Sequence, residues 1–443
     1  MTSRPYRWPL RAVFGLLTSL SIPGPAFAQA ASVAILSPSG YATDGQCAGF
    51  PRLPLKTPEG WCAGLVADER DGLRMPRRLL ELSPDRFWIT DMGNWEPKQG
   101  RLLELRATGQ PGEPKRVRVL AKGLDRPHGL IRGPDGRIYV GEAGAIWRTP
   151  SSQVERELVV RDLPDDGAHP LTEMVFAPPG TLYINVGSAT DACRPNSTSA
   201  STAPDPAGPI CPETAAPTPR AAVYQAVFGG PDFKRQTLEP WAHGLRNSLG
   251  LAITHDATRD RQRLWQAENS VDYTDPLAPA EELNELVKGG NYGWPYCVTN
   301  AQGRSVALDD GRKGAKKRVQ CPLIDARAPF MAWPAHVAPL QLLAVPAAKP
   351  GEPELPWSGR LLAVWHGYRA QGHRIVGWRL DPQGQPQGER EDLVADWDAV
   401  PGLRPLGNPA GITVDSRGRL WIVEDRNRTV IVIAPQTPPT AAR

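Results

Sequence analysis

The sequence lacks an excess of charge of either sign. It contains 51 Lys and Arg against 47 Asp and Glu, and without the three arginines of residues 1–28 its net charge of +4 falls to +1. A nucleic-acid-binding surface normally shows as a basic excess, so the composition argues against that function. Hydrophobic residues make up 40% of the chain, which is enough for a large packed core and excludes global disorder.

The motifs of several enzyme classes are missing too. The chain has no G-x-S-x-G, H-E-x-x-H or dinucleotide-binding fingerprint, so nothing indicates a serine hydrolase, a zinc protease or a nicotinamide-dependent enzyme. It has no C-x-x-C-H either, which excludes covalent haem attachment to this chain, and no C-x-x-C metal pattern.

Long apolar runs are absent after the first residues. At the start, three arginines precede the apolar stretch Ala12–Ile22, and Ala26 and Ala28 are small residues that flank a cleavage point. This stretch is too short to span a bilayer, which takes about 20 residues. We therefore predict a signal peptide over residues 1–28 and a periplasmic or secreted mature protein without membrane insertion.

The number of cysteines is even, so all of them can pair in disulfides if the protein is exported. The chain has 6 cysteines, which in an exported protein form disulfides. Sequence-local pairing is the simplest of the alternatives, and the others stay open. It joins Cys47 to Cys62, Cys193 to Cys211, and Cys297 to Cys321.

A short apolar strand recurs along the chain and decides the fold class. Each copy places an aromatic or aliphatic residue between apolar neighbours, several follow a Pro/Gly/Asp turn, and some are preceded by a second apolar strand. The copies are Arg86–Ile89, Arg137–Val140, Thr181–Ile184, Arg263–Gln266, Arg360–Ala363 and Arg419–Ile422. Six such repeats predict an all-β, six-bladed β-propeller with four antiparallel strands in each blade, with an ordinary β-sandwich as the alternative.

The repeat spacing is uneven, which indicates blades with loop insertions. We predict one propeller domain over residues 29–434 and a flexible tail over 435–443. Residues 194–220 form a polar insertion rich in Pro, Ser and Thr, and residues 298–320 form a basic one. The basic loop either docks an acidic redox partner or is simply solvated.

Residues at the start of each blade converge on one end of a propeller channel, where ligands usually bind. The repeat alignment places a set rich in His, Arg and Asn there, and His366 follows the fifth repeated strand. The set suits an anionic ligand held while a proton moves. Its members are Arg77, His128, His169, Arg246, Asn247, His336 and Asn408.

Several segments resemble the soluble glucose/sorbosone dehydrogenases. The most specific stretch runs from His243-Gly-Leu-Arg-Asn247 through Leu264–Asn269 and Glu282–Asn284 to Gly290-Asn-Tyr-Gly-Trp-Pro295. Trp333–Pro339 is similar to the family's start of blade five. The resemblance implies a six-bladed propeller that uses pyrroloquinoline quinone (PQQ) and Ca²⁺ to oxidise an aldose or related sugar.

The resemblance also implies roles for individual residues. His169 matches the general base that takes the substrate hydroxyl proton, and Arg246 and Asn247 match cofactor contacts. The backbone carbonyls of Ser270 and Val271 match calcium ligands. Further cofactor contacts are predicted at His128, His336, Arg369, Arg404 and Asn408, and Glu282 is predicted to bind a second calcium ion or to cap a loop.

The chain departs from the family pattern in its arginines. Near the last blade, Gly407–Ala410 occupies the stretch where some members place two arginines, and only Arg404 is nearby. After His169, the stretch Pro170–Glu173 has no arginine where relatives often carry one. Fewer positive charges therefore face the three carboxylates of PQQ.

Two other functions fit a six-bladed propeller. A calcium-dependent lactonase or esterase would hold its metal on Glu268, Asn247 and Asn408, and a non-catalytic propeller would bind a sugar or a protein. For the dehydrogenase, a separate electron acceptor, a cytochrome or a quinone, is expected because the chain has no haem motif.

Overall fold

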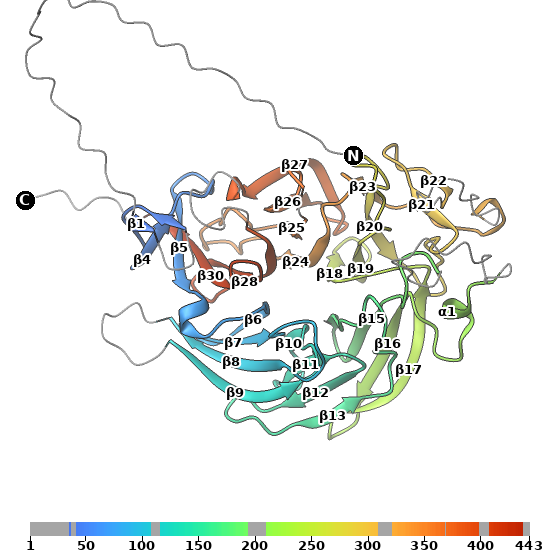
Figure 1. Ribbon diagram of the computed structural model, residues 1–443, viewed down its shortest axis with the longest axis horizontal. Coiled ribbons are helices and arrows are strands. Elements are labelled where there is room, and N and C mark those ends of the chain that lie inside the picture. The colour runs from blue at the N-terminus through green and yellow to red at the C-terminus, as the bar shows by residue number, and fades with distance from the viewer. Residues whose placement is uncertain are drawn as a thin grey trace, which may run out of the picture. The chain divides into compact units, whose positions relative to one another are not determined.

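Antiparallel sheets radiate from a central axis in the computed structural model, which describes residues 35–36, 41–107, 116–193, 210–308, 321–367, 369–397 and 407–436 (Figure 1). Six sheets form the blades, so the predicted six-bladed propeller is confirmed. The predicted signal peptide and Arg404 lie outside the described residues, as do residues 437–443 of the tail.

Five blades consist of four strands each, in chain order from the axis outward (Figure 1). Blade 1 contains β6 (Pro76–Ser83), β7 (Arg86–Asp91), β8 (Gly100–Arg106) and β9 (Val117–Leu124). Blade 2 contains β10 (Leu130–Arg132), β11 (Ile138–Glu142), β12 (Ala145–Thr149) and β13 (Glu157–Val160). Blade 3 contains β14 (Met174–Ala177), β15 (Thr181–Val186), β16 (Ala222–Gly229) and β17 (Lys234–His243). Blade 4 contains β18 (Gly250–Asp256), β19 (Arg261–Glu268), β20 (Glu281–Leu286) and β23 (Met331–Trp333). Blade 5 contains β24 (Pro339–Val345), β25 (Arg360–Trp365), β26 (Arg374–Leu380) and β27 (Pro386–Val394).

The sixth blade closes the ring with both ends of the described chain. It orders β28 (Pro409–Val414), β29 (Leu420–Glu424) and β30 (Thr429–Pro435) against β5 (Trp61–Ala67), followed by β4 (Phe50–Leu53) and β3 (Gln46–Cys47). β5 pairs antiparallel with β30, with Ala63 opposite Ile433. A small separate sheet pairs β1 (Ile35–Leu36) with β2 (Ala42–Thr43).

The sequence repeat is the second strand of each blade: β7, β11, β15, β19, β25 and β29. Both faces of these strands are covered because neighbouring blades pack on them, which explains their continuous apolar character. Trp88, Tyr139, Trp265 and Trp421 are at most 1% exposed. Between blades 1 and 6, the rings of Phe87 and Trp421 lie 4.3 Å apart.

All three predicted disulfides form. Cys47–Cys62 joins β3 to β5. The other two sit in the insertions, where the four-residue helix α1 (Pro212–Ala215), the hairpin β21 (Cys297–Thr299) and β22 (Ser305–Ala307), and the 3-10 turn η2 (Cys321–Leu323) are described. These insertions pack on each other, since the Tyr296 hydroxyl accepts a hydrogen bond from the Cys211 amide at 2.8 Å.

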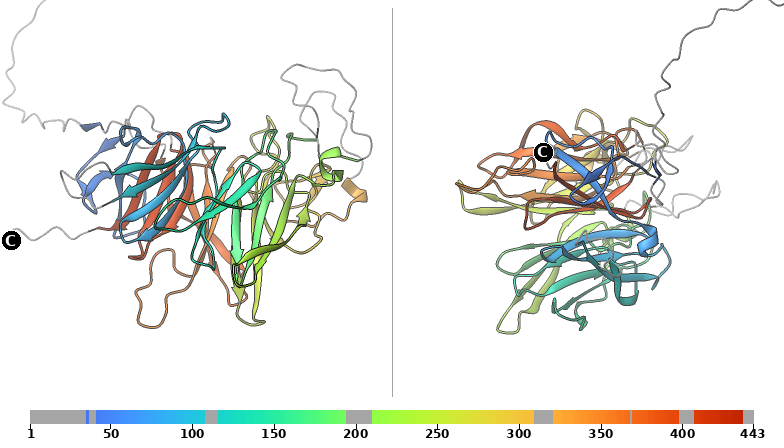
Figure 2. Two further views of the ribbon diagram at one scale, coloured as in Figure 1. Left: turned by 90° about the horizontal axis from the view of Figure 1, so that it is seen from below. Right: turned by 90° about the vertical axis from the view of Figure 1, so that its left-hand side faces the viewer.

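Strand direction sorts the loops between the two ends of the propeller. The connection between the second and third strands of a blade lies at the end where its first strand starts, and α1 belongs to such a connection, so we call this the α1 end. Figure 2 shows the loop between β24 and β25 at the opposite end from α1. No helix in the described ranges has the length and apolar character to cross a membrane.

Candidate functional site

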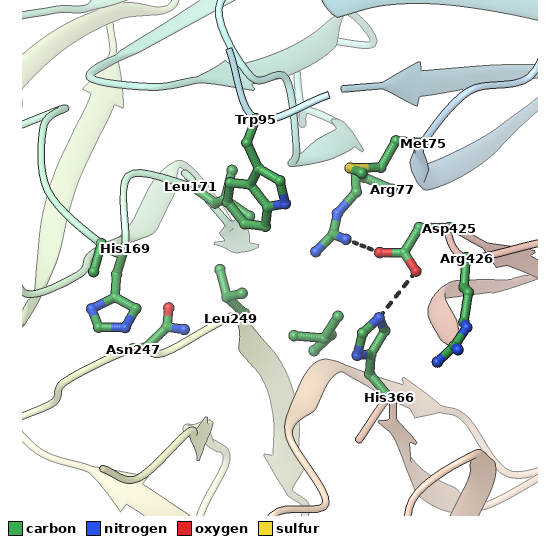
Figure 3. A pocket seen from close by; sticks show the side chains of 12 residues that line it. Met75, Arg77, Trp95, His169, Leu171, Asn247, Leu249, His366, Asp425 and Arg426 are labelled. Carbon is green, nitrogen blue, oxygen red and sulfur yellow. Dashed lines mark hydrogen bonds and ion pairs between the residues drawn. The ribbon is translucent and has the colours of Figure 1, made fainter. Parts of the chain in front are cut away.

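Two adjoining cavities lie at the α1 end. The first has a volume of about 300 Å³ and the second about 500 Å³. Trp95, His169 and Asn247 line both, so the two spaces meet at these side chains. In the first cavity, His169 and Asn247 lie on one side and Arg77, Asp425 and His366 on the other (Figure 3).

His169 precedes β14 and is oriented by Ser188, which follows β15. Its Nδ1 lies 2.9 Å from both the Ser188 carbonyl oxygen and the Ser188 hydroxyl oxygen. That hydroxyl donates its own hydrogen to the Thr190 carbonyl at 2.6 Å. Two acceptors therefore face Nδ1, so Nδ1 carries the proton and Nε2 keeps the lone pair.

The electrostatic surroundings of His169 favour the neutral ring. Burial and the nearby Arg246 guanidinium lower the pKa of His169 well below its usual value. The imidazole is therefore unprotonated at neutral pH and can accept a proton at Nε2.

Arg246 lines the second cavity and is almost fully buried. Its Nη1 donates to the Asn269 carbonyl at 2.9 Å, and its Nη2 contacts the carboxylates of Asp191 at 2.6 Å and Asp272 at 3.1 Å. Its buried Nε has no partner among the described residues. The predicted contacts His336 and Arg369 line this cavity as well.

The wall of the second cavity near blade 4 presents oxygen atoms. Ser270 and Glu281 both line it, and the Ser270 amide donates to Glu281 Oε2 at 2.6 Å. Burial raises the pKa of Glu281 to about 8, because no solvent stabilises its charged form. Glu281 was not predicted from the sequence, although strand alternation requires that it and Glu282 face opposite sides of β20.

The other two predicted metal ligands are not among the residues that line the two cavities. Glu282 is buried and accepts from the Asn284 amide at 3.0 Å. The Val271 side chain packs in an apolar cluster with Cys193 and Cys211, and its backbone carbonyl, the predicted ligand atom, accepts from the Tyr273 amide at 3.1 Å. In the described ranges, the only group of three His, Cys, Asp or Glu ligand atoms close enough to share a metal is Cys193, Cys211 and Glu213, and its cysteines form a disulfide.

Two residues of the predicted ring line neither cavity. His128 is fully buried, with its Nδ1 accepting from Arg77 Nε at 3.2 Å. Asn408 is also fully buried, and its amide donates to the His366 carbonyl at 2.7 Å. The Glu268 carboxylate is also buried, and it accepts hydrogen bonds from the Asn247 backbone amide, the Ser248 hydroxyl and the Gln266 side-chain amide. Of the three ligands suggested for a lactonase metal, only Asn247 therefore lines a cavity.

The far wall of the first cavity contains residues that sequence reasoning missed. Asp425 follows β29 and is paired with both Arg77 and His366, whose Nε2 lies 3.0 Å from Asp425 Oδ1 (Figure 3). Burial alone would raise the pKa of Asp425, but His366 and Arg77 outweigh it and hold this pKa below its usual value. Arg426 adds a cation at the rim.

A buried ion pair fills the channel below the cavities. Arg78 Nε donates to Glu173 Oε2 at 2.6 Å, and the guanidinium also binds the backbone carbonyls of Ala410, Leu249 and Leu340. Arg78 thus connects blade 1 to blades 3, 4, 5 and 6. Glu173 is the counter-ion of this contact.

A model of the glucose/sorbosone dehydrogenase family matches residues 148–362. The resemblance to this family is confirmed. The match spans blades 3 and 4, and therefore includes His169, Arg246, Asn247 and Ser270. No curated protein matches the chain at a significant level.

Solved structures share the fold over most of the chain. A Trichoderma reesei carbohydrate-active enzyme of family AA12 is 20% identical, with a TM-score of 0.63 over 89% of this chain and 100% of its own. The PQQ domain of a pyranose dehydrogenase from Coprinopsis cinerea, in its holo form, is 19% identical, with a TM-score of 0.60 over 88% of this chain and 100% of its own. A PQQ-bound aldose sugar dehydrogenase from Streptomyces coelicolor is 16% identical, with a TM-score of 0.52 over 85% of this chain and 99% of its own.

Proposed function

We propose that this protein is an exported dehydrogenase that oxidises an aldose or related sugar with PQQ and Ca²⁺. The observation that carries the proposal is the geometry of His169, whose protonated Nδ1 is held by Ser188 while the ring lines both cavities. The glucose/sorbosone dehydrogenase match and the PQQ-binding structural neighbours support the same chemistry.

His169 acts as the general base. Its neutral Nε2 accepts the proton of the substrate hydroxyl as the neighbouring carbon–hydrogen bond breaks. Ser188 keeps the ring in the required tautomer, and Arg246, by disfavouring a second positive charge, keeps it unprotonated before the reaction.

The second cavity fits the cofactor. Arg246 offers a buried N–H without a partner in the described part of the chain, and Asn247, His336 and Arg369 surround the same space. Bound in this cavity, PQQ would supply the acceptor for the hydride that leaves the substrate carbon. A guanidinium suits its carboxylates because the planar fork of donors matches a carboxylate.

Calcium fits the oxygen-rich wall of the second cavity. Ser270, Asn247 and the Glu281 carboxylate provide the hard oxygen donors that Ca²⁺ prefers. A cation beside Glu281 would also compensate the charge of a carboxylate that burial otherwise keeps protonated. Its role would be to polarise the bound quinone oxygen as a Lewis acid.

Export and electron transfer complete the proposal. Three disulfides are typical of an oxidising compartment, which supports a periplasmic or secreted location. A separate cytochrome or quinone would serve as the electron acceptor that reoxidises the cofactor.

Titration with PQQ and excess Ca²⁺ tests the proposal directly. We expect stoichiometric binding in the quinone absorption spectrum, a rise in the melting temperature that a chelator reverses, and dye reduction with a sugar. Arg246→Gln should weaken PQQ binding, whereas Arg235→Gln, on the exposed part of β17, should not. Failure of the wild-type protein to bind PQQ at micromolar concentration would refute the proposal.

A further inference from the structure

The junction of the two cavities fixes where a sugar must react, if the proposed function holds. The base has to face both the cofactor and the substrate, and His169, with Asn247 and Trp95, lines both spaces. Because the second cavity holds the residues suited to the cofactor, the first cavity is left for the substrate. This division makes its remaining walls the surfaces that recognise the sugar.

Trp95 forms one of these walls from the loop between β7 and β8. Its indole is 54% exposed and projects toward the middle of the first cavity (Figure 3). The base of the loop is fixed, because the buried Asp91 carboxylate accepts from the amides of Met75 at 3.0 Å and Gly93 at 2.9 Å. Gly93 has a φ of +75°, and a Cβ there would collide with the Gln99 carbonyl. An exposed indole on a fixed loop is therefore presented to the cavity rather than folded away from it.

The opposite wall is charged and internally paired. Asp425 lies between Arg77 and His366, so its position is set before any ligand binds. The floor between the two walls is apolar and includes Leu171 and Leu249 (Figure 3). At about 300 Å³ the cavity is at the small end of ligand pockets, which suits one sugar ring better than an oligosaccharide.

This combination matches the two-sided character of a pyranose. Such a ring has apolar C–H faces, which pack on aromatic and aliphatic side chains, and a polar rim of hydroxyl groups that form charge-assisted hydrogen bonds. We propose that the first cavity is the sugar subsite, with Trp95 stacked on one face of a single pyranose ring and Asp425, held by Arg77 and His366, accepting hydrogen bonds from its hydroxyls. Trp95 is thereby a specificity-determining residue: it selects sugars whose ring has a flat face that carries no branching substituent.

Substitution of Trp95 tests the subsite. D-glucose, D-galactose, D-xylose and L-fucose are compared by dye reduction and by calorimetric binding to the PQQ-free protein. For the best of these sugars, Trp95→Ala should raise KM and Kd about tenfold, since stacking of a ring on an indole is worth roughly that factor. Its kcat should change less than about threefold, and its affinity for PQQ should fall by less than its affinity for the sugar, although Trp95 lines the second cavity as well. Trp95→Phe, which keeps a flat ring, should recover most of the loss, and Leu158→Ala, equally exposed on β13, should change nothing.

The possible failures are distinguishable. An unchanged KM in Trp95→Ala, with active wild-type protein, would overturn the subsite and leave the proposed function standing. A loss of PQQ affinity in Trp95→Ala as large as the loss of sugar affinity would place the indole on the cofactor and would likewise overturn the subsite. A wild-type protein that neither binds nor oxidises any of the four sugars would overturn both the subsite and the proposed function.

Discussion

Replacement of His169 by glutamine is the sharpest test of the proposed chemistry. A glutamine amide fills the space of the imidazole and can still contact Ser188, but it cannot take a proton. Loss of a positioned general base lowers turnover by about 10² to 10⁴, which corresponds to roughly 3 to 5 kcal/mol in the activation free energy. Because glutamine keeps the volume of the ring and the contact with Ser188, and because the proposed PQQ contacts are Arg246 and its neighbours rather than His169, the affinity for PQQ should stay nearly the same.

The assay combines steady-state dye reduction, a PQQ titration and a pH profile. In the wild-type protein, kcat/KM should stay flat through neutral pH and fall only on acidification, because the pKa of His169 is well below its usual value. The same substitution at His255, which is 54% exposed in its side chain and paired with Asp260 at the opposite end of the propeller, is the control and should leave turnover unchanged. Retention of more than about a tenth of wild-type turnover by His169→Gln would refute the assignment of the base.

Three further predictions concern stability and metal binding. Arg78→Met should lower the free energy of unfolding in urea by about 3 to 5 kcal/mol, since it leaves a buried carboxylate unpaired. The double variant Arg78→Met/Glu173→Gln should recover part of that free energy. The control Arg379→Met breaks an exposed ion pair and should cost at most about 1 kcal/mol. Below about pH 6.5 the wild-type protein should lose free energy of unfolding relative to a His128→Gln variant, because the pKa of buried His128 is well below its usual value and the unfolded chain binds the proton that the folded protein excludes; a difference between the two proteins that does not change with pH would contradict this cause. Glu281→Gln should abolish the calcium-dependent rise in melting temperature of the PQQ-loaded protein. If a chelator lowers the melting temperature of this variant as much as that of the wild-type protein, Glu281 does not bind the metal.

The fold could be predicted because its repeat is local. Each second strand lies between two neighbouring blades, so burial on both faces leaves an apolar-aromatic run that is visible in the sequence, as in Arg86–Ile89 and Arg419–Ile422. The sixth blade is larger than predicted, because β4 and β3 extend it beyond β5. That extension depends on pairing between distant segments, which no local pattern reveals.

The site was only partly predictable, because the sequence argument considered the starts of the blades. Those positions gave His169, Asn247 and His336, which reach the cavities. Trp95 and Asp425 follow second strands, and a loop there has no repeat that marks it. The same argument could not tell that the His128 side chain is directed into the packed channel, since this depends on its contact with Arg77.

The Arg78 contact has a consequence for how the protein works with its partners. A guanidinium bonded to three blades' carbonyls and to Glu173 closes the axis of the propeller, so the axis is not a through-passage. Under the proposed function, the sugar and a separate electron acceptor would then both reach the cofactor from the α1 end, one after the other. We therefore expect ping-pong kinetics, with parallel lines in double-reciprocal plots. A high concentration of either partner should inhibit, because each partner bound at this end excludes the other.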